Sequence, residues 1–256
     1  MSIQDRADAL RTLHEAPQIL RVVNAWDAVS ARTIADLPET RAVATAGHSI
    51  AASHGYRDGE MPRDVNLAAV ARIVEAVDLP VSADLDAGYD DAGETVRRAI
   101  GVGVVGANIE DRLIPFDDAV ARVHAAVRAA EAEGVDFQLN ARTDAIVRAG
   151  DRPLAESIDD AIARGRAFLD AGAALVFVPG ALDRDTVSRL VEGIGVRRVS
   201  VIGLPGALTA AEYEALGVAR ISYGPLTQRV ALRALRDLAA DLYADGVVPE
   251  DTPPLN

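Results

Sequence analysis

The sequence predicts a single (β/α)8 barrel of the α/β class. Apolar runs that indicate buried strands alternate with helical patterns, and eight such strand–helix units follow one another along the chain. The length of 256 residues is enough for one barrel of ordinary size. An open, doubly wound sheet is the alternative, but no GxGxxG turn follows the first expected strand.

The individual elements follow from apolar periodicity and from the residues that end each pattern. Strands are expected near residues 19–24, 41–45, 80–84, 104–109, 136–141, 174–178, 198–202 and 218–222. Helices are expected over Asn66–Val77, Glu94–Ile100, Asp118–Glu133, Ser157–Ala171 and Arg184–Glu192. Gly134 and Gly172 each stand just past the last apolar residue of a helix, as C-capping glycines do. One domain is therefore expected over residues 1–246, followed by an extended proline-containing tail over residues 247–256.

The composition excludes several classes of partner. The formal net charge is −13, and the chain has no basic cluster, which argues against nucleic acids and anionic membrane surfaces as partners. No apolar run approaches membrane-spanning length, and the N-terminus does not resemble a signal peptide. We therefore expect a cytoplasmic protein.

Two residue types are missing from the chain. The sequence contains no cysteine, which excludes disulfides, thiolate metal sites and cysteine nucleophiles. It also contains no lysine, since every basic side chain apart from histidine is an arginine. Schiff-base chemistry through a lysine amine is therefore excluded, and with it class I aldolases and pyridoxal enzymes.

Carboxylates stand at the ends of two neighbouring strands. Asp84 and Asp86 follow the apolar run that begins at Pro80, and Glu110 ends the next strand. In a barrel the carboxyl ends of the strands form the active-site face, so these acids can share one site. Mg²⁺ prefers a few carboxylates with several waters retained, and the pattern predicts such a site, with Mn²⁺ as the alternative ion. The other interpretation is that they are surface acids that cap helices.

Arg142 and the turn over residues 46–48 are further candidates for binding or catalysis. Arg142 follows a strand within Asn-Ala-Arg-Thr-Asp and is expected to bind a substrate carboxylate in a bidentate manner, or else to pair with Asp144 or with a metal-binding acid. Backbone N–H groups of Ala46 and Gly47 follow the second strand and could hold an anionic oxygen, or simply start a helix. His48 belongs to the same turn and either reaches the mouth or lies on the surface.

Two other residues are less informative by spacing alone. Asp58 lies in a long polar connection, where an ordinary Asp-Gly turn is the stronger interpretation of Asp58-Gly59. His14 is expected to face solvent.

Taken together, five segments resemble the isocitrate lyase/phosphoenolpyruvate mutase superfamily. They run in order along the chain, and the resemblance extends from about Val22 to Leu242. The segments are Asn24-Ala-Trp26-Asp27-Ala-Val-Ser30-Ala-Arg32, Gly55-Tyr-Arg-Asp58, Ala83-Asp84-Leu-Asp86-Ala-Gly88-Tyr89, Asn108-Ile-Glu110-Asp111 and Asn140-Ala-Arg142-Thr-Asp144.

The resemblance implies a role for each matching residue. It implies a Mg²⁺ site with Asp84 nearest the metal and with Asp86 and Glu110 helping directly or through water. The substrate-binding and catalytic positions that it implies are Trp26, Asp27, Ala46, Gly47, His48, Asp58, Asp84 and Arg142. It also implies a homo-oligomer, a dimer or tetramer, in which the last barrel helix near Leu226–Tyr243 is exchanged between subunits.

The chain departs from the superfamily in the connection after Glu110. The lyases carry a mobile loop there with a catalytic cysteine, whereas this chain runs from Arg112 to Asp118 directly into a helix. The leading hypothesis is a Mg²⁺-dependent carbon–carbon lyase or decarboxylase. It would act on a small 2-oxo or 2-hydroxy carboxylate through an enolate that the metal stabilises. The alternatives are phosphonopyruvate hydrolase or phosphoenolpyruvate mutase chemistry at a P–C bond, and a barrel that binds an oxo acid without turnover.

Overall fold

The computed structural model describes residues 1–253 and contains a nearly closed barrel of parallel strands. Nine strands form one sheet in the order β1-β9-β8-β7-β6-β5-β4-β3-β2, and every neighbouring pair is parallel. The strands are β1 (Leu20–Val22), β2 (Asn24–Ala25), β3 (Val43–Thr45), β4 (Val81–Asp84), β5 (Gly106–Glu110), β6 (Gln138–Arg142), β7 (Leu175–Phe177), β8 (Val199–Ile202) and β9 (Arg220–Ser222). The predicted barrel is therefore confirmed.

The first expected strand is split into two pieces. β1 pairs with β9, whereas β2 pairs with β3, and only Val23 separates the two pieces. The expected strand at 19–24 thus fills one position of the barrel with two short strands, and the other seven expected strands are found as single strands. Asn24 joins the closing seam, because its side chain accepts hydrogen bonds from the N–H groups of Tyr223 and Gly224 and donates to the Thr45 carbonyl.

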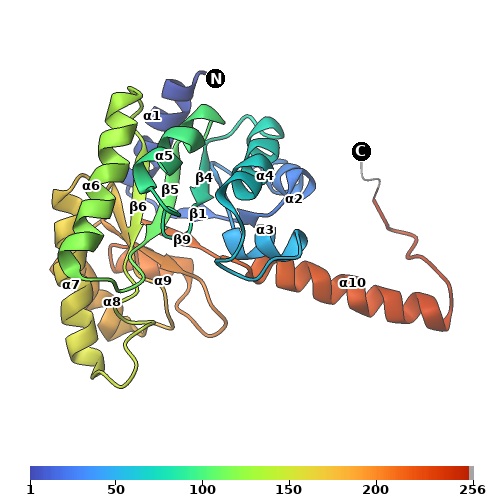
Figure 1. Cartoon of the computed structure of the whole chain (residues 1–256). Helices are drawn as coiled ribbons and strands as arrows, with labels where there is room; N and C mark the ends of the chain where they lie inside the picture. The colour runs from blue at the N-terminus through green and yellow to red at the C-terminus, as the bar shows by residue number, and fades with distance from the viewer. Residues whose placement is uncertain (254–256) are drawn as a thin grey trace.

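Helices surround the strands, and each helix that was expected from the sequence is present (Figure 1). They are α1 (Ile3–Glu15), α2 (Ala28–Ala35), α3 (Gly47–Ser53), α4 (Arg63–Glu75), α5 (Ala92–Gly101), α6 (Phe116–Ala132), α7 (Leu154–Asp170), α8 (Arg184–Ile194), α9 (Ala210–Ala215) and α10 (Leu226–Ala244). Gly134 and Gly172 follow α6 and α7 with φ of 68° and 99°, so the predicted glycine C-caps are confirmed.

The short connection from β5 to α6 is fixed by a buried ion pair. The Asp111 carboxylate pairs with Arg164 of α7 at 3.1 Å, and Arg164 also donates to the Ile114 carbonyl. Asp111 further accepts the N–H groups of Leu113 and Asp144. Its carboxylate therefore holds together the ends of two neighbouring strand–helix connections.

The expectation that His14 faces solvent is wrong. His14 is only 4% exposed, because α1 lies across the end of the barrel opposite the carboxyl ends of the strands, and the last turn of α1 meets the start of β6. Its Nδ1 lies 3.4 Å from Oε1 of Gln138. Burial, together with the charges of Arg220 and Arg197, lowers the pKa of His14 to about 3, so the imidazole is neutral.

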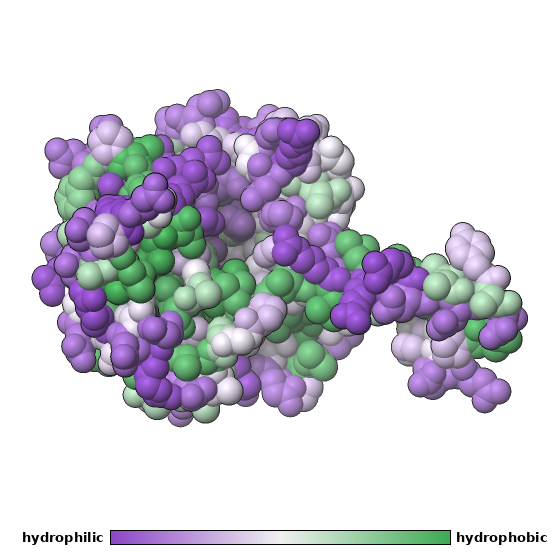
Figure 2. Space-filling view, turned by 90° about the horizontal axis from the view of Figure 1, so that it is seen from below, coloured by the Kyte–Doolittle hydropathy of each residue, from purple (hydrophilic) through white to green (hydrophobic). Residues whose placement is uncertain are grey.

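The last helix leaves the barrel. Figure 1 shows α10 running away from the rest of the molecule, and the space-filling view of Figure 2 shows hydrophobic residues among the hydrophilic ones on this projecting part. Its first turn is held to α3 by Gln228, which donates to the Ser49 carbonyl and to the Ser53 hydroxyl. Further along, Val230, Leu232, Leu235 and Tyr243 are exposed.

Residues 246–253 form no helix or strand, and the Thr252 N–H donates to the Pro249 carbonyl in a turn. The last part of the expected tail, residues 254–256, lies outside the described residues. None of the helices formed by residues 1–253 is both long and apolar enough to cross a membrane.

Candidate active site

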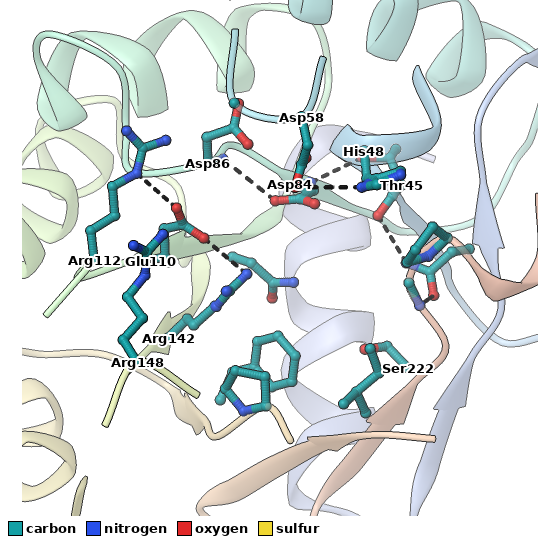
Figure 3. Close-up of a pocket in the computed structure, with 18 residues that line it drawn as sticks. Thr45, His48, Asp58, Asp84, Asp86, Glu110, Arg112, Arg142, Arg148 and Ser222 are labelled. Atoms are coloured by element: carbon teal, nitrogen blue, oxygen red, sulfur yellow. Dashed lines mark hydrogen bonds and ion pairs between the residues drawn. The ribbon is translucent and has the colours of Figure 1, made fainter. Parts of the chain in front are cut away.

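A cavity of about 560 Å³ opens at the carboxyl ends of the strands. Strand register sets its polar rim, because Asp84 pairs with Asn108, and Glu110 pairs with Arg142. Figure 3 shows the carboxylates of Asp84, Asp86 and Glu110 and the guanidinium of Arg142 directed toward the same space. The prediction that these strand ends share one polar site is therefore consistent with the geometry.

Asp84 is held by three segments of the chain. Its carboxylate accepts the Gly47 N–H at 2.9 Å, its own N–H donates to the Thr45 hydroxyl at 2.9 Å, and its carbonyl accepts from Asn66 at 3.0 Å. Burial raises the pKa of Asp84 and the nearby charge of Glu110 adds to the rise, against the lowering effects of the Gly47 N–H and of Arg142. Asp84 is thus a fixed carboxylate that a nearby cation would stabilise in its charged form.

Asp86 follows in a turn with φ of 50°, and its N–H lies 3.4 Å from Oδ1 of Asp84. Burial raises the pKa of Asp86 to about 7, and the negative charges of Asp84 and Glu110 contribute to the rise. Three carboxylates that repel one another in this way favour the binding of a positive ion between them.

Arg142 is bound by two acids. It donates to Glu110 at 2.9 Å and to Asp144 at 2.7 Å, and its guanidinium carbon lies 6.0 Å from the centre of the Phe177 ring. The salt bridge to Asp144, which was the alternative interpretation of this motif, is present. Burial opposes the charged form of Arg142, but the charges of Glu110, Asp144 and Asp84 raise its pKa above the ordinary value.

Two more arginines stand at the rim. Arg112 donates to Glu110 at 2.8 Å, and Arg148 donates to Asp144 at 3.0 Å. Neither arginine was predicted from the sequence as a site residue. Their signal was their spacing, because Arg112 follows Glu110 by two residues and Arg148 follows Asp144 by four. Neither position shows by itself that the side chain turns back to the strand end.

His48 and Asp58 also line the cavity and lie close together. Nδ1 of His48 is 3.4 Å from Oδ2 of Asp58. His48 lies in the first turn of α3, and Asp58 comes from the polar connection between α3 and α4, so the two approach from different segments (Figure 3). For Asp58, the turn interpretation that spacing favoured is incomplete, since its carboxylate also faces the cavity.

Other predicted site residues take structural positions. Asp27 is the N-cap of α2, where it accepts the Ser30 N–H at 2.7 Å, and Trp26 packs against the core. Ala46 is the buried N-cap residue of α3. The residues that line the cavity do not include Trp26, Asp27, Ala46 or Gly47. The Gly47 N–H donates to the Asp84 carboxylate.

The donor set suits an ion that keeps much of its water. Among residues 1–253, no three histidine or acidic side chains lie close enough together to hold a metal by direct contact alone. Mg²⁺ commonly binds through one or two carboxylates and several waters, which fits Asp84 as the direct ligand with Asp86 and Glu110 reached through water. Glu110 is also shared with Arg112 and Arg142, which favours an indirect role for it.

The family model described as phosphoenolpyruvate phosphomutase matches residues 10–243. The chain belongs to this family. The 2,3-dimethylmalate lyase of Eubacterium barkeri is 31% identical over 260 residues, which cover 93% of this chain and 86% of the relative. An oxaloacetate decarboxylase of Rhodopseudomonas palustris is 30% identical over 266 residues, covering 96% of this chain and 90% of the relative.

Solved structures agree with this assignment. The crystal structure of 2,3-dimethylmalate lyase, a member of the PEP mutase/isocitrate lyase superfamily, superposes with a TM-score of 0.86 at 26% identity, covering 97% of this chain and 92% of the other. The resemblance inferred from the five motifs is therefore confirmed. The relatives of this family member include proteins named as lyases and as decarboxylases.

Proposed function

We propose that this protein is a Mg²⁺-dependent carbon–carbon lyase that acts on a small 2-oxo or 2-hydroxy carboxylate, with decarboxylation of an oxaloacetate-type acid as its simplest reaction. The observation that carries the proposal is the juxtaposition of the Asp84–Asp86–Glu110 carboxylates with Arg142 in one cavity. A 2-oxo acid carries an oxo oxygen next to a carboxylate. A cation site beside a guanidinium can therefore bind both groups at once, with the carboxylate at the guanidinium. The names of the relatives support the same reaction class.

The metal would be held by Asp84, with Asp86 and Glu110 acting through bound water. When bound, Mg²⁺ supplies positive charge that stabilises the oxygen on which negative charge develops as the carbon–carbon bond breaks. Asp84 is well suited to this role because contacts from Thr45, Gly47 and Asn66 fix its position before the ion arrives.

Arg142 would bind the substrate carboxylate. Its Nε and one terminal nitrogen are paired with Asp144 and Glu110, and these two bonds hold the plane of the guanidinium against the cavity. Phe177 supports the other side of the group at 6.0 Å. A guanidinium fixed in this way loses little side-chain entropy when a carboxylate binds.

Decarboxylation of an oxaloacetate-type acid breaks one carbon–carbon bond. The bond between the carbon next to the oxo group and the leaving carboxylate breaks, its electron pair passes toward the oxo oxygen, and CO2 leaves. The resulting enolate then takes a proton at carbon. His48 is our candidate for the donor, with Asp58 orienting the imidazole at 3.4 Å.

Tyr89 is less suitable as the proton donor. Its hydroxyl accepts a hydrogen bond from Asn66 at 2.9 Å, and burial and the charge of Asp86 raise its pKa above the ordinary value, so it releases a proton less readily than a free tyrosine. Tyr89 also lines a neighbouring cavity rather than the one that contains Arg142.

The deciding experiment measures pyruvate release with MgCl2 and with EDTA over oxaloacetate, substituted malates, methylisocitrate and phosphonopyruvate. Mg²⁺-dependent turnover of a carbon substrate well above the metal-only background supports the proposal. Phosphate release from phosphonopyruvate alone would favour P–C chemistry, and oxo-acid binding without any product would favour a binding protein; either result contradicts the proposal.

Asp84→Ala should reduce the metal-dependent turnover to background, because the carboxylate that places the ion is lost. Asp151→Ala is the matched control, since Asp151 is an exposed aspartate outside the cavity and its loss should leave turnover intact. Full activity in Asp84→Ala would contradict the mechanism.

We also propose that α10 packs against a second copy of this chain. Its exposed leucines, Leu232 and Leu235, lie one turn apart on a helix that projects from the barrel. Leu235→Arg should therefore lower the mass measured by light scattering after gel filtration, whereas Arg236→Ala, at an exposed neighbouring position, should not. A wild-type chain that elutes as a monomer would contradict this assembly.

A further inference from the structure

The walls of the active-site cavity differ in charge. Strands β4, β5 and β6 and their connections contribute all of its arginines and most of its acids. The wall after β7, β8 and β9 instead contains Phe177, Pro179, Ile202, Ser222, Gly224 and Pro225. We call Phe177, Pro179 and Ile202 the apolar wall.

The apolar wall begins beside Arg142, the proposed partner of the substrate carboxylate. Arg142 pairs in register with Phe177, and the guanidinium lies over the Phe177 ring. Ile202 pairs with Ser222 further round the barrel, and both side chains line the same cavity. A substrate whose carboxylate meets Arg142 therefore has the apolar wall beside the carbon atoms that follow.

A charged substituent would bind poorly against this wall. The charged group would lose its bound water there. Among the side chains that line the cavity after β7, β8 and β9, only the Ser222 hydroxyl could form a hydrogen bond with it. The two arginines that could receive a second carboxylate, Arg112 and Arg148, are already paired with Glu110 and Asp144. An alkyl group, in contrast, gains from leaving water.

We propose that the preferred substrate carries an uncharged alkyl substituent on the carbon next to its oxo group, and that Phe177, Pro179 and Ile202 form the subsite for it. This inference rests on the proposed function, because that function places the carboxylate at Arg142. The substrate class is then an oxaloacetate-type acid that carries an alkyl group beside its leaving carboxylate, in place of an acid with a further charged arm.

Binding measurements test the subsite without any need for turnover. We would titrate the protein with pyruvate, 2-oxobutyrate, 2-oxopentanoate and 2-oxoglutarate by calorimetry in MgCl2. Affinity should rise by about fourfold for each added methylene, which corresponds to about 0.8 kcal/mol per buried CH2. The dicarboxylate 2-oxoglutarate should bind more weakly than 2-oxopentanoate. Equal affinities along the series, or tighter binding of 2-oxoglutarate, would overturn the inference.

Variants of Ile202 assign the effect to the wall. Ile202→Asn should flatten the dependence on chain length, whereas Ile202→Leu, which keeps an apolar side chain of the same size, should preserve it. An unchanged dependence in Ile202→Asn would contradict the assignment. A chain-length dependence in a protein that turns over neither oxaloacetate, nor the substituted malates, nor methylisocitrate would refute the proposed reaction but support the subsite, so the two failures can be told apart.

Discussion

The two sides of the active-site cavity are built by different physical means. On the side of β4–β6, Glu110, Arg142 and Asp144 form a connected set of ion pairs, joined at the rim by Arg112 and Arg148. On the side of β7–β9, the wall consists of packed apolar side chains with Ser222 as an exception. A change in one member of the ion-pair set alters the partners of the others, whereas the apolar residues act through shape and size. Chemistry is therefore expected to depend on the first side and substrate choice on the second.

The largest effect is expected at Arg142, where the two sides meet. Arg142→Met should lower kcat/KM by roughly 10²–10³-fold, because it removes a charged hydrogen-bonding partner of the substrate. Arg148→Met is the matched control: it also removes a partner of Asp144, but its side chain is 53% exposed at the rim. We expect a loss of less than about tenfold for Arg148→Met. Equal losses for the two variants would mean that Arg142 acts only as part of the ion-pair set.

Stability should depend more on the Asp111–Arg164 pair than on exposed pairs. Both side chains are almost fully buried, so Arg164→Met leaves Asp111 without its charged partner and should lower the free energy of unfolding by about 3–5 kcal/mol. Urea denaturation measures this change. Arg189→Met breaks an exposed pair with Asp159 and should cost less than about 1 kcal/mol. Similar values for the two variants would contradict the anchoring role of Asp111.

The smallest predicted effect is the pH dependence of stability that His14 causes at the other end of the barrel. The pKa of His14 is lowered to about 3 in the folded protein, so the unfolded chain binds the proton more tightly. Stability from this group is therefore complete above about pH 6.5 and is lost as the pH falls toward 3, by up to about 1.4 kcal/mol per pH unit. By pH 5 the loss should be about 2 kcal/mol.

His14→Gln should remove this part of the pH dependence of unfolding, measured in urea between pH 7 and pH 5. His124→Gln, which changes an exposed histidine, should retain it. Parallel pH profiles for His14→Gln and the wild type would show that another group is responsible.

The sequence by itself determined the barrel, the order of its elements and the acidic strand ends. These follow from local information, because apolar periodicity and glycine caps act within one element, and parallel strands place their carboxyl ends on one face. The same strand-end pattern predicted Asp84, Asp86, Glu110 and Arg142 as site residues, and the resemblance to the family then implied a role for each.

Only the tertiary structure decided which side chains meet. Asp111 stands next to Glu110 in the sequence, yet it turns away from the cavity to pair with Arg164, some fifty positions later. The burial of His14 depends on where α1 crosses the barrel, and the apolar wall depends on the register of β7 with β6. Such contacts join residues that are distant along the chain, so local patterns do not encode them and the packing of the whole barrel sets them.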